Sequence, residues 1–244
     1  MTGINEGTDM TQDDTITTKA PTRRTQAKVE RRLALIEATM EAIALYGLSG
    51  TTMARVTEIA GTSIGLANFY FENKELLLEA VLQHLADQEQ AVLQEHLAQA
   101  IDDPGERLIA LVDARFDPRV CAPKTAAIWF AFWGDASARL IYRRVVQRTD
   151  DARLEAVVPL IKSLLAEQDG PPRDAYDIAL GMEAFYDGLW LNILLYPDDF
   201  QRADCRNRAV DHLTSLFPQR FNTLSLAANG ANQAACSKDM THGP

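Results

Sequence analysis

Hydrogen-bonding residues are concentrated at the start of a short apolar segment that follows Gly61. Ser63 is expected to cap a helix there, and Ile64, Gly65 and Asn68 then lie on or near its exposed start. The side-chain amide of Asn68 can form a paired hydrogen bond with adenine, and Gly65 allows a close approach to DNA. This spacing predicts a helix whose side chains contact base edges in a major groove.

Three further residues near this segment have the chemistry of phosphate contacts. Thr52 is expected to cap the preceding helix and to present its backbone amide to a phosphate. Lys74, at the start of the next helix, is placed to pair with a second phosphate. Tyr70 can either pack in the core or donate a hydrogen bond from its hydroxyl to the DNA backbone, and the sequence leaves both readings open.

Aromatic residues in the second half of the chain have a spacing suited to binding a cation. Trp129, Phe132 and Trp133 share one face of a predicted helix, and Asp135 lies beside that face, one turn beyond Phe132. Each aromatic face can hold a quaternary ammonium group with about 0.5–2 kcal/mol. The same stripe is equally compatible with an ordinary helical core, and Asp135 with a solvated surface charge.

A later helix carries a second pair of such residues, Asp187 and Trp190, which are three positions apart. The three Trp residues of the chain all fall in these two segments. Together these residues would line a ligand pocket, and Phe116, in a predicted loop, is expected at the entrance of that pocket. Asp187 has an alternative reading as a structural ion-pair partner.

The elements that must position these residues are helices, because hydrophobic periodicity is helical almost throughout and no alternating pattern indicates a strand. A long helix of 29–46 is followed by a helix capped at Thr51 or Thr52 that runs to Ala60, and then by the short helix after Ser63. The later helices are expected at 73–101, 105–115, 123–148, 150–168, 173–196 and 199–217. Pro159 should kink or split one of them.

The fold class is therefore predicted to be all-α, with two domains between loose ends. Residues 1–27 are expected to be disordered, although the basic end of this tail could instead lie along a minor groove. Residues 28–75 should form a three-helix helix-turn-helix DNA-binding domain. Residues 76–218 should form a helical ligand-binding and dimerisation domain, and 219–244 a flexible tail.

Charge is distributed unevenly along the 244 residues. The net charge is −10, but residues 19–75 carry eight Lys or Arg against six Glu. Positive charge therefore lies where a phosphate backbone would be met, and the acidic remainder limits unspecific binding. The same acidic remainder disfavours a non-specific architectural DNA protein.

Several other classes of protein and site lack support in the sequence. The four His are scattered, and no nucleophile elbow, phosphate-binding glycine loop or metal-type cluster is present, so we expect no enzyme, cofactor or metal. No apolar run reaches the roughly 18 residues of a membrane span, and the N-terminus lacks a signal-peptide pattern. We expect a cytoplasmic protein in which Cys121, Cys205 and Cys236 are buried or idle thiols.

The run from Leu35 to Leu76 resembles the TetR family of bacterial repressors. The matching pieces are Tyr46-Gly47, Thr51-Thr52-Met53, Ile59-Ala60-Gly61-Thr62-Ser63, Gly65, Tyr70-Phe71 and Asn73-Lys74-Glu75-Leu76. Many members have Leu-Tyr where this chain has Ala67-Asn68, so the phosphate contact of that Tyr does not carry over to position 68. The resemblance implies a repressor that an effector releases from its operator DNA.

The second half resembles the choline-sensing, BetI-like subfamily of these repressors. The matching pieces are Arg115-Phe116-Asp117, the segment 127–133 and the segment 186–191. The resemblance implies choline or a related quaternary ammonium as effector, with a different amine, a lipid-like or an aromatic ligand as the alternative. A homodimer is expected through helices 173–196 and 199–217. Its candidate interface residues are Leu180, Phe185, Leu189, Ile193, Leu213 and Leu216, some of which must instead face their own core.

Overall fold

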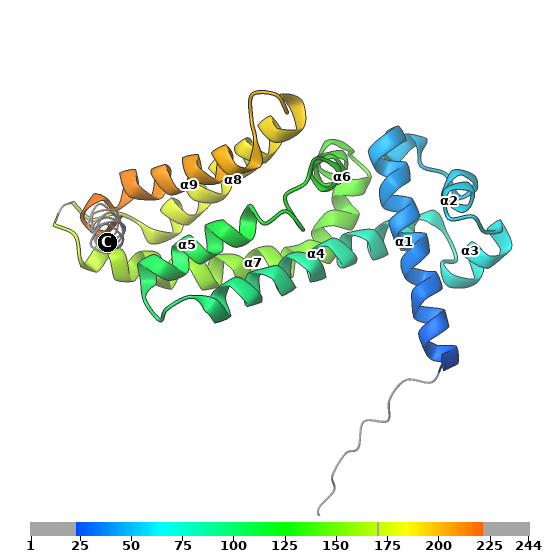
Figure 1. Cartoon of the computed structure of the whole chain (residues 1–244), viewed down its shortest axis with the longest axis horizontal. Coiled ribbons are helices and arrows are strands. Elements are labelled where there is room, and N and C mark those ends of the chain that lie inside the picture. The colour runs from blue at the N-terminus through cyan, green and yellow to red at the C-terminus, as the bar shows by residue number, and fades with distance from the viewer. Residues whose placement is uncertain (1–22, 170, 222–244) are drawn as a thin grey trace, which may run out of the picture.

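The computed structural model describes residues 23–169 and 171–221, and over these residues the chain is built from nine helices and a short helical turn at 218–221, without a strand. The predicted all-α fold class is confirmed. Residues 1–22 and 222–244, which contain most of both predicted tails, lie outside the described residues. Figure 1 shows an elongated molecule, with the first three helices at one end and the remaining helices lying alongside one another.

The first three helices, α1 (Arg23–Gly50), α2 (Met53–Ile59) and α3 (Ile64–Tyr70), form a small unit that we call the head. The last turn of α1 is displaced at Gly47, whose φ of 66° is a left-handed value that favours glycine. Gly61, with φ of 61°, makes the turn between α2 and α3. Side chains from all three helices fill one core, including Leu35, Ile43, Val56 and Ala67.

Helix α1 begins earlier than predicted. Residues 23–27, expected to be disordered, form its first turns. The residues there, Arg-Arg-Thr-Gln-Ala, include good helix formers and no Gly or Pro, so the helix propagates beyond the part that the core requires.

The remaining helices form a body that packs around the long helix α4. They are α4 (Lys74–Gln99), α5 (Pro104–Arg115), α6 (Pro123–Gly134), α7 (Ala138–Ala166), α8 (Ala175–Leu195) and α9 (Arg202–Leu216). Helix α4 packs against α5 and α7, and α8 packs against α6, α7 and α9. Figure 1 shows α4, α5, α7, α8 and α9 running roughly along the long axis of the molecule, with α6 crossing that direction near α1. The cap predicted at Thr51 or Thr52 is Thr52, and the predicted cap at Ser63 is present; Asn73 caps α4 at the start of the helix expected over 73–101.

Two predicted boundaries in the body are wrong. The helix expected over 123–148 ends at Gly134, because the carboxylate of Asp135 accepts hydrogen bonds from the backbone N–H groups of Ser137 and Ala138 and so starts a new helix. The break expected near residue 149 is absent, and α7 continues through it. Pro159 lies inside α7 without splitting it.

The predicted C-terminal tail also begins too early. Residues 218–221 are helical, and the side chain of Phe221 is buried against Phe217. Because these two aromatic side chains are buried in the core, the chain stays packed against the body for a few residues after α9 ends. The prediction placed the tail too early because the composition beyond residue 222 is typical of a flexible tail.

The head joins the body through α1, which packs against both α4 and α6. The ammonium of Lys74, at the start of α4, donates a hydrogen bond of 2.7 Å to the carbonyl of Leu48 near the end of α1. Lys124 of α6 pairs with Glu41 of α1 at 2.5 Å. The orientation of the head is thus tied to two helices of the body.

Although no uninterrupted apolar run reaches a membrane span, two helices are long and apolar enough to cross a membrane by length and composition. These are α1 and α8, each with a mean hydropathy of 1.3 in its most apolar window. Each buries seven side chains in the packed protein, which accounts for much of this composition. Cys121 and Cys205 are buried free thiols, as predicted, and burial raises the pKa of Cys121 to about 12; Cys236 lies outside the described residues.

Candidate functional site

The predicted base-contacting residues lie together at the exposed start of α3. Ser63, Ile64, Gly65 and Asn68 are all exposed, and the Ser63 hydroxyl accepts a hydrogen bond from the backbone N–H of Leu66 at 3.2 Å. This cap fixes the first turn of α3 and leaves the side chains of Ile64 and Asn68 facing outward. Thr52 is also exposed and caps α2, where its hydroxyl accepts from the N–H of Arg55.

The other two predicted DNA contacts have partners within the protein. Tyr70 is half-buried, with its ring edge-on to Phe69 at 5.3 Å between ring centres. Lys74 is half-buried and uses one of its three donors on the Leu48 carbonyl, which leaves two donors for a phosphate.

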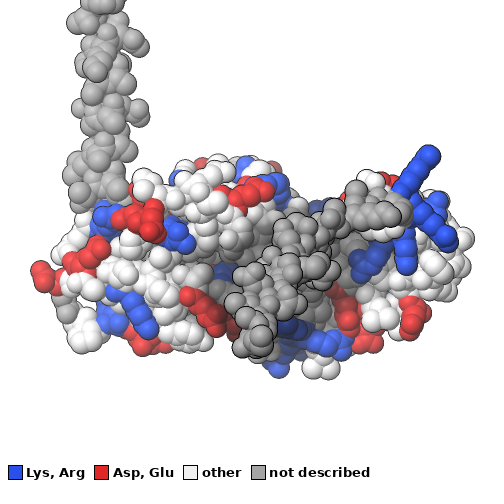
Figure 2. All heavy atoms as spheres, turned by 90° about the horizontal axis from the view of Figure 1, so that it is seen from below, with Lys and Arg blue, Asp and Glu red and all other residues white. Residues whose placement is uncertain are grey.

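Sequence reasoning missed Phe69 as a surface residue. Its side chain is 72% exposed on the same short helix that presents Asn68, and Ile64 of that helix is 48% exposed, so α3 presents apolar as well as polar side chains at its surface. Figure 2 shows Lys and Arg side chains projecting at the end of the molecule that the head forms. The helical spacing of α3 could have placed Phe69 beside Asn68.

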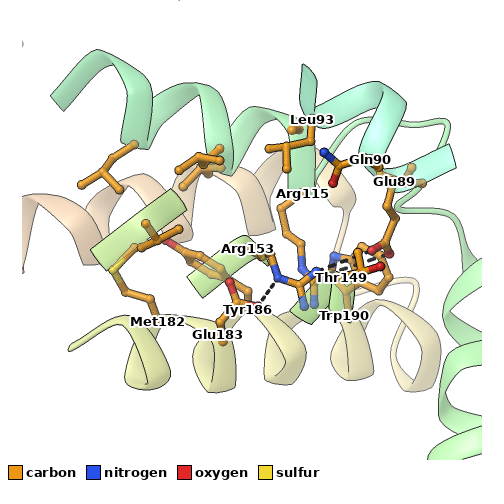
Figure 3. A pocket seen from close by; sticks show the side chains of 16 residues that line it. Glu89, Gln90, Leu93, Arg115, Thr149, Arg153, Met182, Glu183, Tyr186 and Trp190 are labelled. Carbon is orange, nitrogen blue, oxygen red and sulfur yellow. Dashed lines mark ion pairs between the residues drawn. The ribbon is translucent and has the colours of Figure 1, made fainter. Parts of the chain in front are cut away.

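Two adjoining pockets lie inside the body, between α4, α5, α7 and α8, with α6 closing one of them. Both are lined by Glu89, Arg115, Arg153, Glu183 and Trp190. One, which we call the apolar pocket, adds mainly aliphatic side chains together with Met182 and Tyr186 (Figure 3). The other, which we call the aromatic pocket, adds Trp129, Trp133, Tyr142, Val146, Asp150, Leu154, Leu180 and Asp187.

The rings of the aromatic pocket meet edge to face. Tyr142 of α7 stands at 5.9 Å from Trp129 and 6.0 Å from Trp133, measured between ring centres, with interplanar angles of 82° and 85°. Such contacts favour fixed ring orientations. The face of Trp190 is covered by the guanidinium of Arg115, which lies 4.4 Å from the ring centre. The protein therefore already places one cation of its own against this aromatic surface.

A network of charged side chains lines both pockets, and Figure 3 shows its members Glu89, Arg115, Arg153 and Glu183 from the side of the apolar pocket. Arg153 pairs with Glu183 at 3.1 Å, with Asp150 at 2.6 Å and with Glu89 at 3.6 Å. Arg115 pairs with Asp187 and, at 4.0 Å, with Glu89. Four carboxylates thus share two guanidinium groups, and the network has a formal net charge of −2.

Burial changes the proton affinities of this network. Desolvation raises the pKa of Glu89, more than the attraction of Arg115 and Arg153 lowers it, and desolvation likewise raises the pKa of Asp187. Burial disfavours the charged form of Arg115, but the carboxylates of Glu183, Glu89 and Asp187 hold its pKa above the usual range. An excess of partly buried carboxylate groups raises the free energy of the folded protein unless a bound cation compensates their charge.

Several buried polar atoms of the pocket-lining residues have no hydrogen-bond partner within the described part of the chain. They include the indole N–H groups of Trp129 and Trp190, the hydroxyl of Tyr186 and the Nε of Arg115. Buried donors of this kind are normally satisfied, so they mark places where a ligand or water can bind.

Of the seven predicted ligand residues, the structure brings four to the aromatic pocket and leaves three outside both pockets. Trp129, Trp133, Asp187 and Trp190 line the aromatic pocket. Phe116 is 1% exposed and packs edge-on against Tyr186, so it is a core residue rather than part of an entrance.

Phe132 and Asp135 are the other two corrections. Phe132 is fully buried and lines neither pocket. At about 3.6 residues per turn it lies about 100° around α6 from Trp133, so its side chain packs in the core while Trp129 and Trp133 reach the aromatic pocket. Asp135 is beyond the end of α6 and is used as a helix cap.

Sequence reasoning missed the charged residues of the pockets. They are Glu89, Arg115, Asp150, Arg153 and Glu183, with Tyr142 beside them. The available signal was Glu183 next to the predicted Asp187 and Trp190 on one helix face, together with Arg153 three residues after Asp150. Glu89 carried no local signal, because it looks like any polar residue of a long helix.

The candidate dimer residues divide into two sets. Leu189, Ile193 and Leu213 are buried in their own core, and Phe185 and Leu216 pack partly against it. Leu180 is 43% exposed. It begins an exposed stripe of α8 that continues at intervals of three or four residues through Ala184, Gly188, Leu191 and Leu195.

Within the described residues, no cluster of three His, Cys, Asp or Glu side chains could hold a metal ion. The comparisons with known proteins agree with a regulatory rather than a catalytic site. Residues 35–81 match the family of bacterial regulatory proteins named for TetR, and residues 104–218 match the C-terminal domain of BetI-type transcriptional repressors.

Among curated proteins, the chain is 35% identical over 192 residues to the HTH-type transcriptional regulator BetI of Burkholderia thailandensis, covering 78% of this chain and 95% of that protein. It is 34% identical over 186 residues to BetI of Pseudomonas paraeruginosa, covering 75% of this chain and 91% of that protein. These similarities extend across both the head and the body.

Among solved structures, a transcriptional regulator from Pseudomonas aeruginosa PAO1 superposes with a TM-score of 0.68 at 25% identity, covering 78% of this chain and 92% of that one. A regulator from Saccharomonospora viridis, solved in complex with choline, superposes with a TM-score of 0.61 at 20% identity, covering 75% and 95%. The second likeness shows the shared fold. The chain belongs to the TetR family of bacterial regulatory proteins, within its BetI-type group of transcriptional repressors, which are not enzymes.

Proposed function

We propose that this BetI-type transcriptional repressor is released from its operator by a quaternary ammonium effector, choline or a close relative, bound in the aromatic pocket. The observation that carries the proposal is the pocket itself, in which three Trp and one Tyr surround a charge network with surplus carboxylate. Aromatic faces and nearby negative charge are the two features that hold a permanent cation.

The open side of the aromatic pocket is the one formed by Trp129, Trp133 and Tyr142, because Arg115 already covers Trp190. An ammonium group seated there would lie beside Asp150 and Asp187. It would compensate the surplus carboxylate, whereas a fatty-acid effector would add a further negative charge. The choline-bound regulator from Saccharomonospora viridis, which shares this fold, supports the same ligand class.

Helix α6 offers a direct route from the pocket to the head. One side of α6 carries Trp129 and Trp133, and α6 also packs against α1. Glu89 adds a second route, since it lies on α4, whose first residue is bonded to α1. An effector that binds one arrangement of these helices more tightly shifts the population of molecules toward that arrangement. If the arrangement also changes the position of the head, effector binding changes operator affinity by the same coupling free energy.

DNA binding is assigned to residues 28–75, which comprise most of the head and the first residues of α4. Ser63, Ile64, Gly65 and Asn68 would contact bases or approach them closely. Thr52, Tyr70 and Lys74 would contact phosphates. Replacement of Asn68 by Ala should relax base preference at one position of each half-site, at about 1–3 kcal/mol. Selection from random duplexes checks this, and unchanged stringency would remove Asn68 from the contact surface.

Two copies of the chain are proposed to pair through α8 and α9, with the exposed stripe of α8 in the contact. Its small members, Ala184 and Gly188, allow two helices to approach closely, and Leu180, Leu191 and Leu195 supply apolar area. Pairing would hold two heads at a fixed separation, as a two-fold operator requires. Residues 76–218 then act as both effector-binding and dimerisation domain of a cytoplasmic repressor.

Calorimetry with the purified protein tests the effector class. Choline should bind, and 3,3-dimethylbutan-1-ol, which has the same shape with carbon in place of the charged nitrogen, should bind at least about tenfold more weakly. Equal affinity for the two compounds, or no heat with millimolar choline or betaine aldehyde, would reject a quaternary ammonium effector. If another amine bound more tightly than choline, the pocket would still select a cation, but the effector would be that amine.

A further inference from the structure

The first turns of α1 carry a concentration of positive charge that the core of the head does not need. Five basic side chains, Arg23, Arg24, Lys28, Arg31 and Arg32, occur in ten residues with Glu30 as the single acid, and all six are exposed. The segment therefore has a net charge of +4 in a chain whose net charge is −10. In Figure 1 this half of α1 extends beyond α2 and α3.

The basic residues lie on a defined side of the helix. Arg24, Lys28 and Arg31 follow one another at intervals of four and three residues, and the same spacing continues into Leu35 and Ala38. Leu35 and Ala38 are buried in the core of the head, whereas the three upstream residues are exposed. One helix face thus changes from apolar, where protein covers it, to basic, where nothing in the described residues covers it. We call Arg24, Lys28 and Arg31 the basic stripe.

The basic stripe runs beside α3, the helix that carries Asn68. The ammonium of Lys28 lies 6.0 Å from the ring centre of Phe69, which is exposed on α3 next to Asn68. One turn later, the guanidinium of Arg32 lies 5.0 Å from the ring centre of Phe71, directly after α3. These contacts hold the start of α1 against the edge of the surface that faces DNA.

We propose that the basic stripe is a second DNA-contacting surface, which binds the phosphates of the strand bordering the groove that α3 enters. This inference rests on the proposed binding of operator DNA by α3. From Arg24 to Arg31 the helix rises about 10 Å at 1.5 Å per residue, and a DNA strand places one phosphate about every 3.4 Å along its axis. The stripe is therefore long enough to follow about three phosphates. The contact adds affinity without base preference.

The test is the salt dependence of operator binding, measured with the full-length protein. Replacing Arg24 and Lys28 together with Gln should make the slope of log affinity against log salt less steep by about two per head, or about four for a dimer. The selected base sequence should stay the same.

Two matched controls remove equal charge elsewhere. Arg23→Gln removes a neighbouring charge that lies about 100° around α1 from Arg24 and so outside the basic stripe, and it should change the slope by less than half as much as Arg24→Gln. Arg148→Gln with Lys162→Gln removes two exposed charges from α7 and should leave the slope unchanged. Melting temperatures of all variants should lie close to that of the parent, since every replaced side chain is exposed.

The outcomes separate the two proposals. If the parent selects and binds an operator but the Arg24 and Lys28 double variant retains the parental slope, the basic stripe does not contact DNA, and binding by α3 still holds. A fall in melting temperature without a change in slope would assign the stripe to a contact within the protein and also overturn the inference. If the parent binds no operator, the proposed function itself fails first.

Discussion

The two neighbouring residues Phe132 and Trp133 separate a core role from a ligand role at the scale of single side chains. Phe132 is fully buried outside the pockets, whereas Trp133 is half-buried and lines the aromatic pocket. Trp133→Leu should weaken choline binding roughly 2–30-fold, the equivalent of one lost cation–π contact. Phe132→Leu should lower the melting temperature and leave choline affinity nearly unchanged.

Calorimetry and thermal melting of the same two variants check this pair. If the two substitutions weakened choline binding equally, or if Trp133→Leu only destabilised the fold, Trp133 would be a core residue and the pocket would need another location.

The raised pKa values of Glu89 and Asp187 predict how effector affinity depends on pH. Both carboxyl groups bind protons at a higher pH than exposed acids because burial disfavours their charged forms. As the pH falls through these raised values, the pocket loses negative charge, so choline affinity should fall, with a limit of about tenfold per pH unit for each group that must be charged. Glu89→Gln and Asp187→Asn should each flatten the profile measured from neutral pH down to the lowest pH at which the protein stays folded. A parental affinity that does not vary over this range would contradict the electrostatic part of the account.

At this scale the sequence predicted that Ser63, Ile64, Gly65 and Asn68 are exposed, and four of its seven predicted ligand residues line the aromatic pocket. It did so because exposure in α3 and the positions of Trp129 and Trp133 follow from helical spacing alone. The charge network could not be predicted in the same way. Glu89, Arg153 and Glu183 come from α4, α7 and α8, and only the packing of these helices decides which charges meet.

Among the helices, the junction between α1 and α4 has the clearest consequence. Lys74 begins α4 and bonds to the Leu48 carbonyl of α1, and it also lies beside the proposed DNA surface. Lys74→Met should lower stability by about 1–3 kcal/mol through loss of a charged hydrogen bond, and it should reduce the salt slope of operator binding by about one per head.

Melting curves and salt titrations of this variant report the two effects separately. Lower stability with an unchanged salt slope would leave Lys74 as a purely structural link between head and body.

Helix boundaries were predictable where Gly, Pro or a capping residue marks them, as at Gly47, Ser63 and Pro104. The break between α6 and α7 was missed because it depends on Asp135 capping a new helix rather than on a helix-breaking residue. The break expected near residue 149 does not occur, because Asp150 is held inside the helix by Arg153 and by the hydroxyl of Tyr142. These interactions form between residues that only the folded structure brings together, so local sequence composition does not predict them.

For the whole molecule, the account requires two heads held together by the bodies. Leu191→Arg combined with Leu195→Arg places two charges on the exposed stripe of α8, so the protein should become monomeric at micromolar concentration. Operator affinity should fall about a hundredfold or more, because the second half-site is no longer bound by the same particle. Leu140→Arg changes an equally apolar and more exposed residue on α7 and serves as the control.

Light scattering and operator titration of both variants check the interface. A dimeric double variant, or a monomer that binds the operator as tightly as the parent, would place the interface elsewhere or remove the need for it.

We propose that a permanent cation in the aromatic pocket and operator DNA on the head favour different states of the same protein. The most direct measurement is the fluorescence anisotropy of a labelled operator, selected with this protein from random duplexes, during titration with choline at constant ionic strength. We predict that choline lowers the bound fraction, that 3,3-dimethylbutan-1-ol does not, and that Trp133→Leu shifts the choline curve to higher concentration. A bound fraction that stays constant with choline, or that falls equally with the uncharged compound, would contradict the account.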